Sequence, residues 1–240
     1  MRIGIISDVH ANLPALDAVL AALGTVDALW HLGDAVGYGP HPDEVVDRLR
    51  DRGAIGVRGN HDAAALGGEE VEHFNPDARR AIAWTIGRMA PTTRAWLAAQ
   101  PERREEGGVT LVHGSPRRPI WQYVLDSWDA ADSFAAFATR WCLHGHTHIP
   151  AAWIEEPDGV SLLQPQPGET LRLEERRLLV NPGSVGQPRD GDPRASALVH
   201  DTEARTLTWL RVPYPIAEVQ AAMRAARLPP ALAARLDLGL

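Results

Sequence analysis

The chain has 240 residues, of which 45% are hydrophobic and 23% are charged, so it can bury a full core and is not disordered. Its formal net charge of −7 argues against an extended nucleic-acid surface or an anionic membrane as partner. All 24 basic residues are arginines, and the lack of lysine excludes Schiff-base chemistry, pyridoxal enzymes and the lysine-dependent phosphate-binding loop.

Cys142 is the only cysteine, which excludes an internal disulfide and a cysteine-based zinc site. It lies in an apolar run, where we expect a buried and unreactive thiol. No apolar run approaches the roughly 18 residues that a membrane helix needs, and no signal-peptide pattern opens the sequence. We therefore expect a cytoplasmic protein, and the composition rich in arginine, alanine, glycine and proline indicates a bacterial source with a GC-rich genome.

The first 57 residues predict a β-α-β-α-β order. Strands are expected at residues 3–6, 28–32 and 54–57, because each run is short, apolar and rich in strand-forming residues. Helices are expected at 12–24 and 42–53, where asparagine or proline opens the segment and glycine closes it. The first strand is apolar throughout, which is typical of a strand buried on both faces.

Residues 63–100 predict helices, with start signals at 75–77 and 91–93. Four large apolar side chains of this segment are expected to pack in the core rather than to form a ligand platform: Trp84, Ile86, Trp96 and Leu97.

The next segment, up to residue 143, predicts two more strands. The charged run at 102–106 is expected to be a solvated loop, and strands are expected at 109–112 and 140–143. A helix that is capped by Asp126 or Ser127 is expected to run to Thr139 between these strands.

The last third of the sequence predicts short alternating strands that form an antiparallel second sheet. They are expected at 151–154, 170–173, 178–181, 195–200 and 207–212, and the tail from Ile216 predicts one or two helices. Since no repeat or linker interrupts the chain, we expect one domain over residues 1–240 with a helical tail at about 216–240.

Polar side chains follow five of the predicted strands. Asp8 and His10 follow the first strand, and they would point to the same side if the chain stayed extended there. The alternative is that Asp8 caps the next helix and His10 is a loop residue. The corresponding residues after the other strands are Asp34, Asn60, His61, His113, His146 and His148. Because sheets of this kind bind ligands at the carboxyl ends of strands, the pattern predicts a site for Mn, Fe or Zn, and a shared carboxylate would allow two ions.

The order D-x-H, G-D, G-N-H-D, H and G-H-x-H resembles the calcineurin-like metallophosphoesterases. The matching residues are Asp8 to His10, Gly33 and Asp34, Gly59 to Asp62, His113, and Gly145 to His148, and the resemblance covers roughly residues 1–200. The stretches at 33–40 and 181–196 resemble the compact bacterial branch, which lacks cap domains. The resemblance implies a four-layer α-β-β-α sandwich of two mixed sheets, with a dinuclear metal site at one end.

The resemblance also implies a role for each motif residue. One metal would be held by Asp8, His10 and His148, the other by Asn60, His113 and His146, and Asp34 would bridge both. His61 would protonate the leaving oxygen, and Asp62 would orient its imidazole. Two divalent ions, Mn first with Fe, Zn or Ni as alternatives, would hold a bridging hydroxide that attacks phosphorus without a covalent intermediate.

For several other residues the sequence allows either a functional or a structural interpretation. Arg58 could bind the substrate phosphate or form a surface ion pair, and Tyr38 could line the entrance or merely serve a tight turn. Arg189 and Arg194 lie in a loop and could select the charge of the substrate. His144 is expected behind the metal ligands. The remaining histidines are expected to be structural or on the surface: His31, His41, His73 and His200.

The sequence therefore predicts a metal-dependent phosphoesterase that hydrolyses a phosphodiester or a small phosphomonoester. Alternatives with the same chemistry are a nuclease, a dinucleoside polyphosphate hydrolase and a protein phosphatase, and the acidic charge disfavours the nuclease. A non-catalytic protein-interaction scaffold is a further alternative, which is disfavoured because every ligand position of the pattern is filled. The expected partner is a small phosphoester substrate, and the sequence leaves homo-oligomers open.

Overall fold

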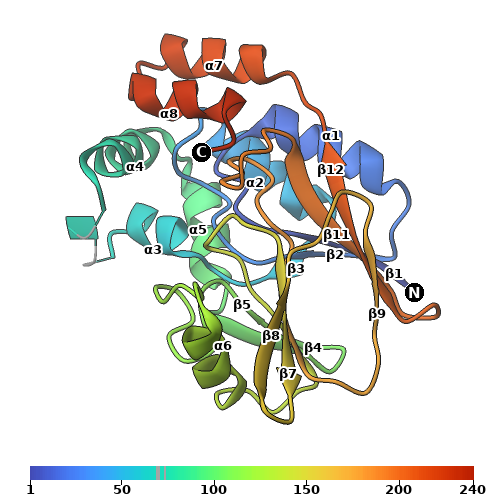
Figure 1. Ribbon diagram of the computed structural model, residues 1–240. Helices are drawn as coiled ribbons and strands as arrows, with labels where there is room; N and C mark the ends of the chain where they lie inside the picture. The colour runs from blue at the N-terminus through green and yellow to red at the C-terminus, as the bar shows by residue number, and fades with distance from the viewer. Residues whose placement is uncertain (69–70, 73) are drawn as a thin grey trace.

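Two six-stranded sheets pack face to face at the centre of the computed structural model, which describes residues 1–68, 71–72 and 74–240 (Figure 1). The strand order is β3-β2-β1-β11-β12-β9 in the first sheet and β4-β5-β6-β10-β7-β8 in the second. Each sheet combines parallel and antiparallel pairs. The predicted α/β sandwich of two mixed sheets is confirmed.

Both sheets are built around three parallel strands. The first sheet contains β1 (Arg2–Ile6), β2 (Ala28–His31), β3 (Ile55–Gly56), β9 (Thr170–Arg172), β11 (Ala195–Asp201) and β12 (Thr206–Val212). The second contains β4 (Arg103–Glu106), β5 (Val109–Val112), β6 (Trp141–Leu143), β7 (Ala151–Glu156), β8 (Gly159–Leu163) and β10 (Leu178–Asn181). The parallel cores are β3-β2-β1 and β5-β6-β10.

Helices cover the outer faces of both sheets. They are α1 (Leu13–Leu23), α2 (Pro42–Asp51), α3 (Asn60–Ala65), α4 (Pro76–Arg88), α5 (Pro91–Ala99), α6 (Ser127–Phe134), α7 (Ile216–Ala225) and α8 (Pro230–Ala234), followed by a 3-10 turn at Arg235–Asp237. Helices α1 and α2 lie over the first sheet, and α6 lies over the second (Figure 1). Within the described ranges, no helix has the length and apolar character that crossing a membrane requires.

The core between the sheets follows from the alternation of side chains along β1. Ile3 and Ile5 face the second sheet and pack with Leu111 and Val180, whereas Ile6 packs with the helices on the other face. Burying an isoleucine of this kind contributes about 1.5–3 kcal/mol to stability. The strand predicted to be buried on both faces is therefore the centre of the first sheet.

The last third of the chain does not form a sheet of its own, so that prediction is wrong. Strands β9, β11 and β12 extend the first sheet, whereas β10 completes the parallel core of the second sheet and β7 and β8 extend it. The reason is the free edge of each parallel core, since β11 pairs with β1 and β7 pairs with β10. Strand β8, the hairpin partner of β7, was not predicted.

The charged run predicted as a loop is in fact the edge strand β4. It pairs antiparallel with β5 through the two-residue turn of Gly107 and Gly108, whose φ angles are +54° and +78°. Such a turn is typical of a tight hairpin, and charged side chains suit an edge strand that faces water. Charge alone was therefore a poor guide to this segment.

Smaller differences concern helix lengths and exposure. Helix α6 ends at Phe134 rather than Thr139, and α3 begins at Asn60, earlier than predicted. Ile86 is 40% exposed and is not a core residue, although Leu97 is fully buried. The tail from Ile216 forms helices α7 and α8, and His73 lies outside the described residues.

The tail packs beside the loop that follows β2. Tyr38 of that loop shares an apolar cluster with Ala81 of α4, with Val219 and Met223 of α7, and with Leu236. The C-terminal helices thus lie against the same end of the molecule as the polar loops (Figure 1).

Candidate functional site

The loops after β1, β2, β3, β5 and β6 meet at one end of the two sheets. They bring together the seven predicted ligands, all of which are buried: Asp8, His10, Asp34, Asn60, His113, His146 and His148. Three groups have ligand atoms within 4.8 Å of one another: Asp8, His10 and His148; His10, Asp34 and His61; and Asp34, His113 and His146. The parallel strand ends therefore converge as the sequence predicted.

The first group presents unprotonated ring nitrogens to a common point. His10 Nδ1 donates to the carbonyl of Val36 at 3.2 Å, and His148 Nδ1 donates to the carbonyl of Gln187 at 2.6 Å. Their Nε2 atoms then face each other at 3.1 Å, and Asp8 Oδ1 lies 3.3 Å from His148 Nε2. Two lone pairs and a carboxylate at this distance repel one another unless a cation lies between them.

The second group has the same arrangement. His113 Nδ1 donates to the carbonyl of Leu32 at 2.8 Å, and His146 Nε2 donates to the carbonyl of Trp121 at 3.2 Å. His113 Nε2 then lies 3.1 Å from His146 Nδ1 and 2.9 Å from Asn60 Oδ1. Burial lowers the pKa of His113, but the carboxylates of Asp34 and Asp8 outweigh burial and raise it to about 9, so a positive charge is favoured here.

Asp34 lies between the two groups. Its Oδ1 accepts from the backbone N–H of His61 at 2.8 Å, whereas its buried Oδ2 has no hydrogen-bond partner among the residues that the structure describes. That Oδ2 lies 3.6 Å from His10 Nε2 and 3.4 Å from His113 Nε2. Within the same described part of the chain, the buried Oδ1 of Asp8 has no hydrogen-bond partner either. Carboxylate oxygens left like this are costly in a protein interior, and with imidazole and amide donors they fit divalent cations.

The backbone at these residues is in a conformation that residues other than glycine seldom adopt. Five candidate ligands have φ angles in the left-handed region: Asp8 (54°), His10 (50°), Asp34 (54°), His146 (68°) and His148 (63°). The expectation that Asp8 and His10 meet because the chain is extended is therefore wrong. They meet because the chain turns sharply at each of them, and such strain is common at functional sites.

The motif glycines allow the loops to approach the ligands closely. A Cβ atom at Gly59 would overlap the carboxylate of Asp34, and one at Gly145 would overlap the hydroxyl of Ser7. Both positions therefore require glycine for a steric reason, which accounts for the glycine in G-N-H-D and in G-H-x-H.

His61 lies in the first turn of α3, with its ring between two aromatic rings. The ring centroids of Tyr38 and Phe74 lie 4.3 Å and 4.6 Å from that of His61, and His10 lies at 4.7 Å. Burial lowers the pKa of His61 to about 4, although Asp34 acts in the opposite direction. Its side chain also lies within ligand distance of His10 and Asp34, so the geometry permits a role in cation binding.

Asp62 does not contact the His61 imidazole, so the prediction that it orients this ring is wrong. Its Oδ1 accepts from the N–H of Val36 at 3.1 Å, and its Oδ2 accepts from the N–H of Gly59 at 3.1 Å. The reason is that α3 begins at Asn60, which places Asp62 in the first turn with its carboxylate pointing back to the helix start. Burial and the negative charge of Asp34 raise the pKa of Asp62.

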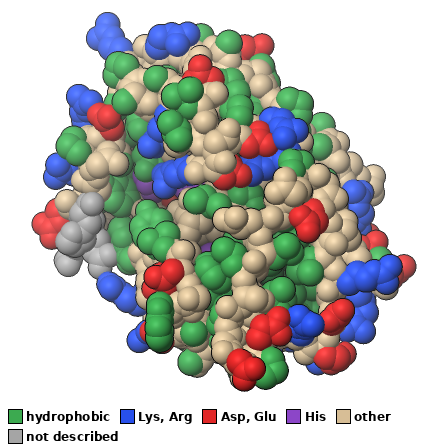
Figure 2. Space-filling model, in the orientation of Figure 1, with side chains coloured by type: hydrophobic (Ala, Val, Ile, Leu, Met, Phe, Trp, Pro, Cys, Tyr) green, Lys and Arg blue, Asp and Glu red, His purple; other side chains and the backbone are tan. Residues whose placement is uncertain are grey.

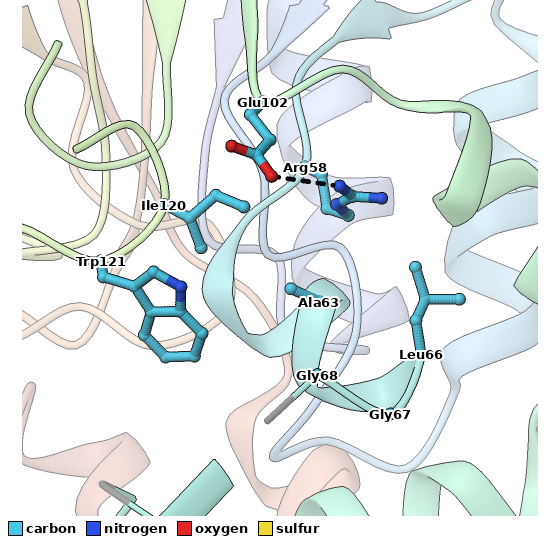
Figure 3. Close-up of a pocket in the computed structure, with 8 residues that line it drawn as sticks. All are labelled: Arg58, Ala63, Leu66, Gly67, Gly68, Glu102, Ile120 and Trp121. Carbon is cyan, nitrogen blue, oxygen red and sulfur yellow. Dashed lines mark hydrogen bonds and ion pairs between the residues drawn. The ribbon is translucent and has the colours of Figure 1, made fainter. Parts of the chain in front are cut away.

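Arg58 lines a pocket beside the ligand cluster (Figure 3). Its guanidinium lies 3.4 Å from Glu102 Oε1, so the ion pair considered for Arg58 is present. The pocket has a volume of about 450 Å³, and its other lining residues are Ala63, Leu66, Gly67, Gly68, Ile120 and Trp121. It adjoins the ligands, because the carbonyl of Trp121 accepts the hydrogen bond from His146.

Several residues around the ligands were not predicted from the sequence. Tyr123 stacks on His146 with ring centroids 3.8 Å apart, and Phe74 packs on His61. Arg235 lies over the ring of Tyr38 at 4.7 Å. No local motif marks these side chains, since tertiary packing brings them here. Figure 2 shows histidine side chains in a hollow of this face, with basic side chains beside them.

The two loop arginines have different positions. Arg189 reaches the site, where its guanidinium lies 3.5 Å from the Tyr38 hydroxyl, whereas Arg194 pairs with Asp192 at 2.7 Å. His144 is buried behind the ligands, where burial lowers its pKa to about 4. His31 stacks on Trp96, as expected for a structural histidine.

Comparisons with known proteins bear on the fold and the family of this chain. The family model of the calcineurin-like phosphoesterase superfamily domain matches residues 1–205. The crystal structure of a metallophosphoesterase from Sphaerobacter thermophilus is 48% identical, with a TM-score of 0.93 over 100% of this chain and 99% of that one. A hypothetical protein from Pyrococcus horikoshii has the same fold, with a TM-score of 0.80 at 17% identity over 100% of this chain and 98% of that one.

Two curated proteins are also similar in sequence. An uncharacterized protein of Methanocaldococcus jannaschii is 36% identical over 244 residues, which are 99% of this chain and 98% of that protein. The phosphodiesterase YfcE of Escherichia coli is 26% identical over 211 residues, which are 83% of this chain and 87% of that protein. The match of the family model over most of the chain, together with these relatives, shows that the protein belongs to the calcineurin-like phosphoesterase superfamily.

Proposed function

We propose that the protein is a metal-dependent phosphoesterase that hydrolyses a phosphodiester or a small phosphomonoester. The observation that carries this proposal is the position of Asp34 Oδ2, which has no hydrogen-bond partner in the described part of the chain and faces both His10 and His113. Two divalent cations, with Mn²⁺ as the first choice, would supply the charge that binds phosphoryl oxygens and acidifies water.

The ligand sets follow from the two groups that share Asp34. Asp8, His10 and His148 would hold one ion, and Asn60, His113 and His146 the other. Backbone carbonyls fix the orientation of each imidazole by accepting a hydrogen bond from its one N–H, which keeps the other, unprotonated nitrogen directed at the cluster. This preorganisation means that the side chains need little movement when they bind cations.

His61 would donate a proton to the leaving oxygen. Tyr38 and Phe74 contact its ring from two sides, and the backbone N–H of His61 donates to Asp34 Oδ1. Burial favours the neutral imidazole, but an anionic phosphoester beside the ring opposes burial and favours the protonated form. Substrate binding would therefore bring the proton to the position where the leaving oxygen needs it.

One relative supports a preference for diesters over monoesters. The Escherichia coli relative is named a phosphodiesterase, and we propose the same preference here. With Mn²⁺ present, bis-p-nitrophenyl phosphate should be cleaved at least as well as p-nitrophenyl phosphate.

The experiment is a panel of phosphoesters assayed by kcat/KM after reconstitution with Mn²⁺, Fe²⁺, Zn²⁺ or Ni²⁺. Elemental analysis of the same samples should give close to two ions per chain. A strong preference for the monoester would favour a phosphatase, and no hydrolysis with any metal would favour the protein-interaction scaffold.

A further inference from the structure

Two arginines from distant parts of the chain meet at the edge of the candidate site. Arg189 lies in the loop after β10, and Arg235 lies in the C-terminal 3-10 turn. Both guanidinium groups donate to Gln187 Oε1, at 3.3 Å from Arg189 and 2.5 Å from Arg235. A single neutral oxygen therefore accepts from two cations.

Neither arginine has a carboxylate partner within 4.0 Å in the described ranges 1–68, 71–72 and 74–240. Arg235 Nε is buried and finds no hydrogen-bond partner in these ranges, although the guanidinium lies 4.7 Å from the centre of the Tyr38 ring. Burial lowers the pKa of Arg235, and the nearby charge of Arg189 lowers it further. Two partly buried like charges of this kind are costly unless an anion binds to them.

The arginine pair adjoins the candidate metal ligands directly. Gln187 accepts from both arginines through its side chain and from His148 Nδ1 through its backbone carbonyl. The Tyr38 ring contacts His10 and His61 with centroids 4.6 Å and 4.3 Å apart, and its hydroxyl lies 3.5 Å from Arg189. A single intervening residue, Gln187 or Tyr38, therefore separates the arginines from the candidate ligands. This places them next to the position where a phosphoryl group would bind.

We propose that Arg189 and Arg235, together with the Tyr38 hydroxyl, bind a second anionic group of the substrate beside the scissile phosphoryl group. Two guanidinium forks and a hydroxyl match the several oxygens of a tetrahedral phosphate better than the two of a carboxylate. The substrate class is therefore a phosphoester that carries an adjoining phosphate, such as a diphosphate or polyphosphate ester. This inference rests on the proposed function, since the second group is defined by the first.

The experiment compares ligands with one and two anionic groups by calorimetry on the Mn²⁺-loaded protein. Methylphosphonate carries one phosphonate, methylenediphosphonate carries two, and phosphonoacetate carries a phosphonate and a carboxylate. Metal content is measured after each titration because the diphosphonate also chelates free Mn²⁺. The variants are Arg189→Met and Arg235→Met, and the matched control is Arg194→Met, which removes an arginine of the same loop that pairs with Asp192.

The measured quantity is the ratio of the two affinities, diphosphonate over methylphosphonate. Charge-assisted hydrogen bonds of this kind are worth roughly a 10- to 100-fold change in affinity. Arg189→Met and Arg235→Met should each lower the ratio by about 10-fold or more and leave the affinity for methylphosphonate unchanged. Arg194→Met should leave the ratio as in the parent protein.

An unchanged ratio in both variants would overturn the inference. A larger gain for phosphonoacetate than for the diphosphonate would overturn the choice of phosphate. If methylphosphonate binds and esters are cleaved but the ratio does not depend on the arginines, only this inference fails. If none of the three ligands binds and no ester is cleaved, the proposed function fails as well.

Discussion

Asp34 is the residue on which both groups of candidate ligands depend, because its Oδ2 faces His10 on one side and His113 on the other. Asp34→Asn should therefore lower the content of both metals, whereas Asp8→Asn should lower mainly that of one. Elemental analysis after Mn²⁺ reconstitution checks this difference. Equal metal content in the two variants would mean that Asp34 does not bridge.

His61 has a role that kinetics can separate from metal binding. A general acid contributes roughly 10²–10⁴ to the rate when the leaving oxygen needs a proton, and nitrophenolate needs little help. His61→Ala should therefore lose much more activity on an alkyl or nucleoside phosphoester than on a nitrophenyl ester.

Metal content is the control for His61→Ala, because His61 also lies within ligand distance of His10 and Asp34. If the variant loses metal and both esters suffer equally, then His61 is a ligand and not a proton donor.

Asp62 should behave as a structural residue. Its two oxygens accept from the N–H groups of Val36 and Gly59, and Asp62→Asn leaves one of these groups without an acceptor. We expect a loss of about 1–3 kcal/mol in the free energy of unfolding, measured with urea. The ratio of rates on alkyl and nitrophenyl esters should not change, and a change in that ratio would show that Asp62 acts on the His61 imidazole.

Residue types at the site were predictable from the sequence, but their surroundings were not. The order of Asp, His and Asn at strand ends indicated which side chains converge. The left-handed backbone at His10 and Asp34 and the approach of Arg235 from the tail have no local signal. They depend on how distant segments pack, which sequence spacing does not report.

Among the elements, the β4-β5 hairpin depends on a turn that glycine favours. Gly108 has φ +78° and open space around its Cβ position, so a side chain there would meet only backbone strain. Gly108→Ala should lower the free energy of unfolding by about 1–2 kcal/mol.

The matched control for Gly108→Ala is Gly87→Ala in helix α4, which is also unobstructed but helical. This change should raise stability by up to about 1 kcal/mol. Urea unfolding of both variants checks the pair, and destabilisation by Gly87→Ala of the same size would mean that the turn conformation is not the cause.

Elements with strong local signals were predicted well, and those defined by long-range pairing were not. The cap at Asn12 and the apolar run of β1 are local features, and both are present in the structure. The sheet to which β11 or β7 belongs depends on a free edge built elsewhere in the chain. Alternation along a strand predicts its faces but not its partner.

At the scale of the whole molecule, metal should stabilise the fold. The facing Nε2 atoms of His10 and His148 and the unpartnered carboxylate oxygens oppose folding until a cation binds among them. Binding to the folded state alone adds about 2.7 kcal/mol at a concentration 100-fold above Kd. Scanning fluorimetry should therefore show a melting temperature that rises with Mn²⁺ and falls with EDTA, and a melting temperature insensitive to both would contradict the assignment.

Strand β1 lies between two strands that the ribosome synthesises at very different times. Its partner β2 spans residues 28–31, but its other partner β11 spans residues 195–201. While the ribosome is making the chain, one edge of β1 therefore stays open until most of the protein has been synthesised. An open apolar edge of this kind can pair with other chains, so the nascent protein should depend on chaperones more than a fold with local pairing does.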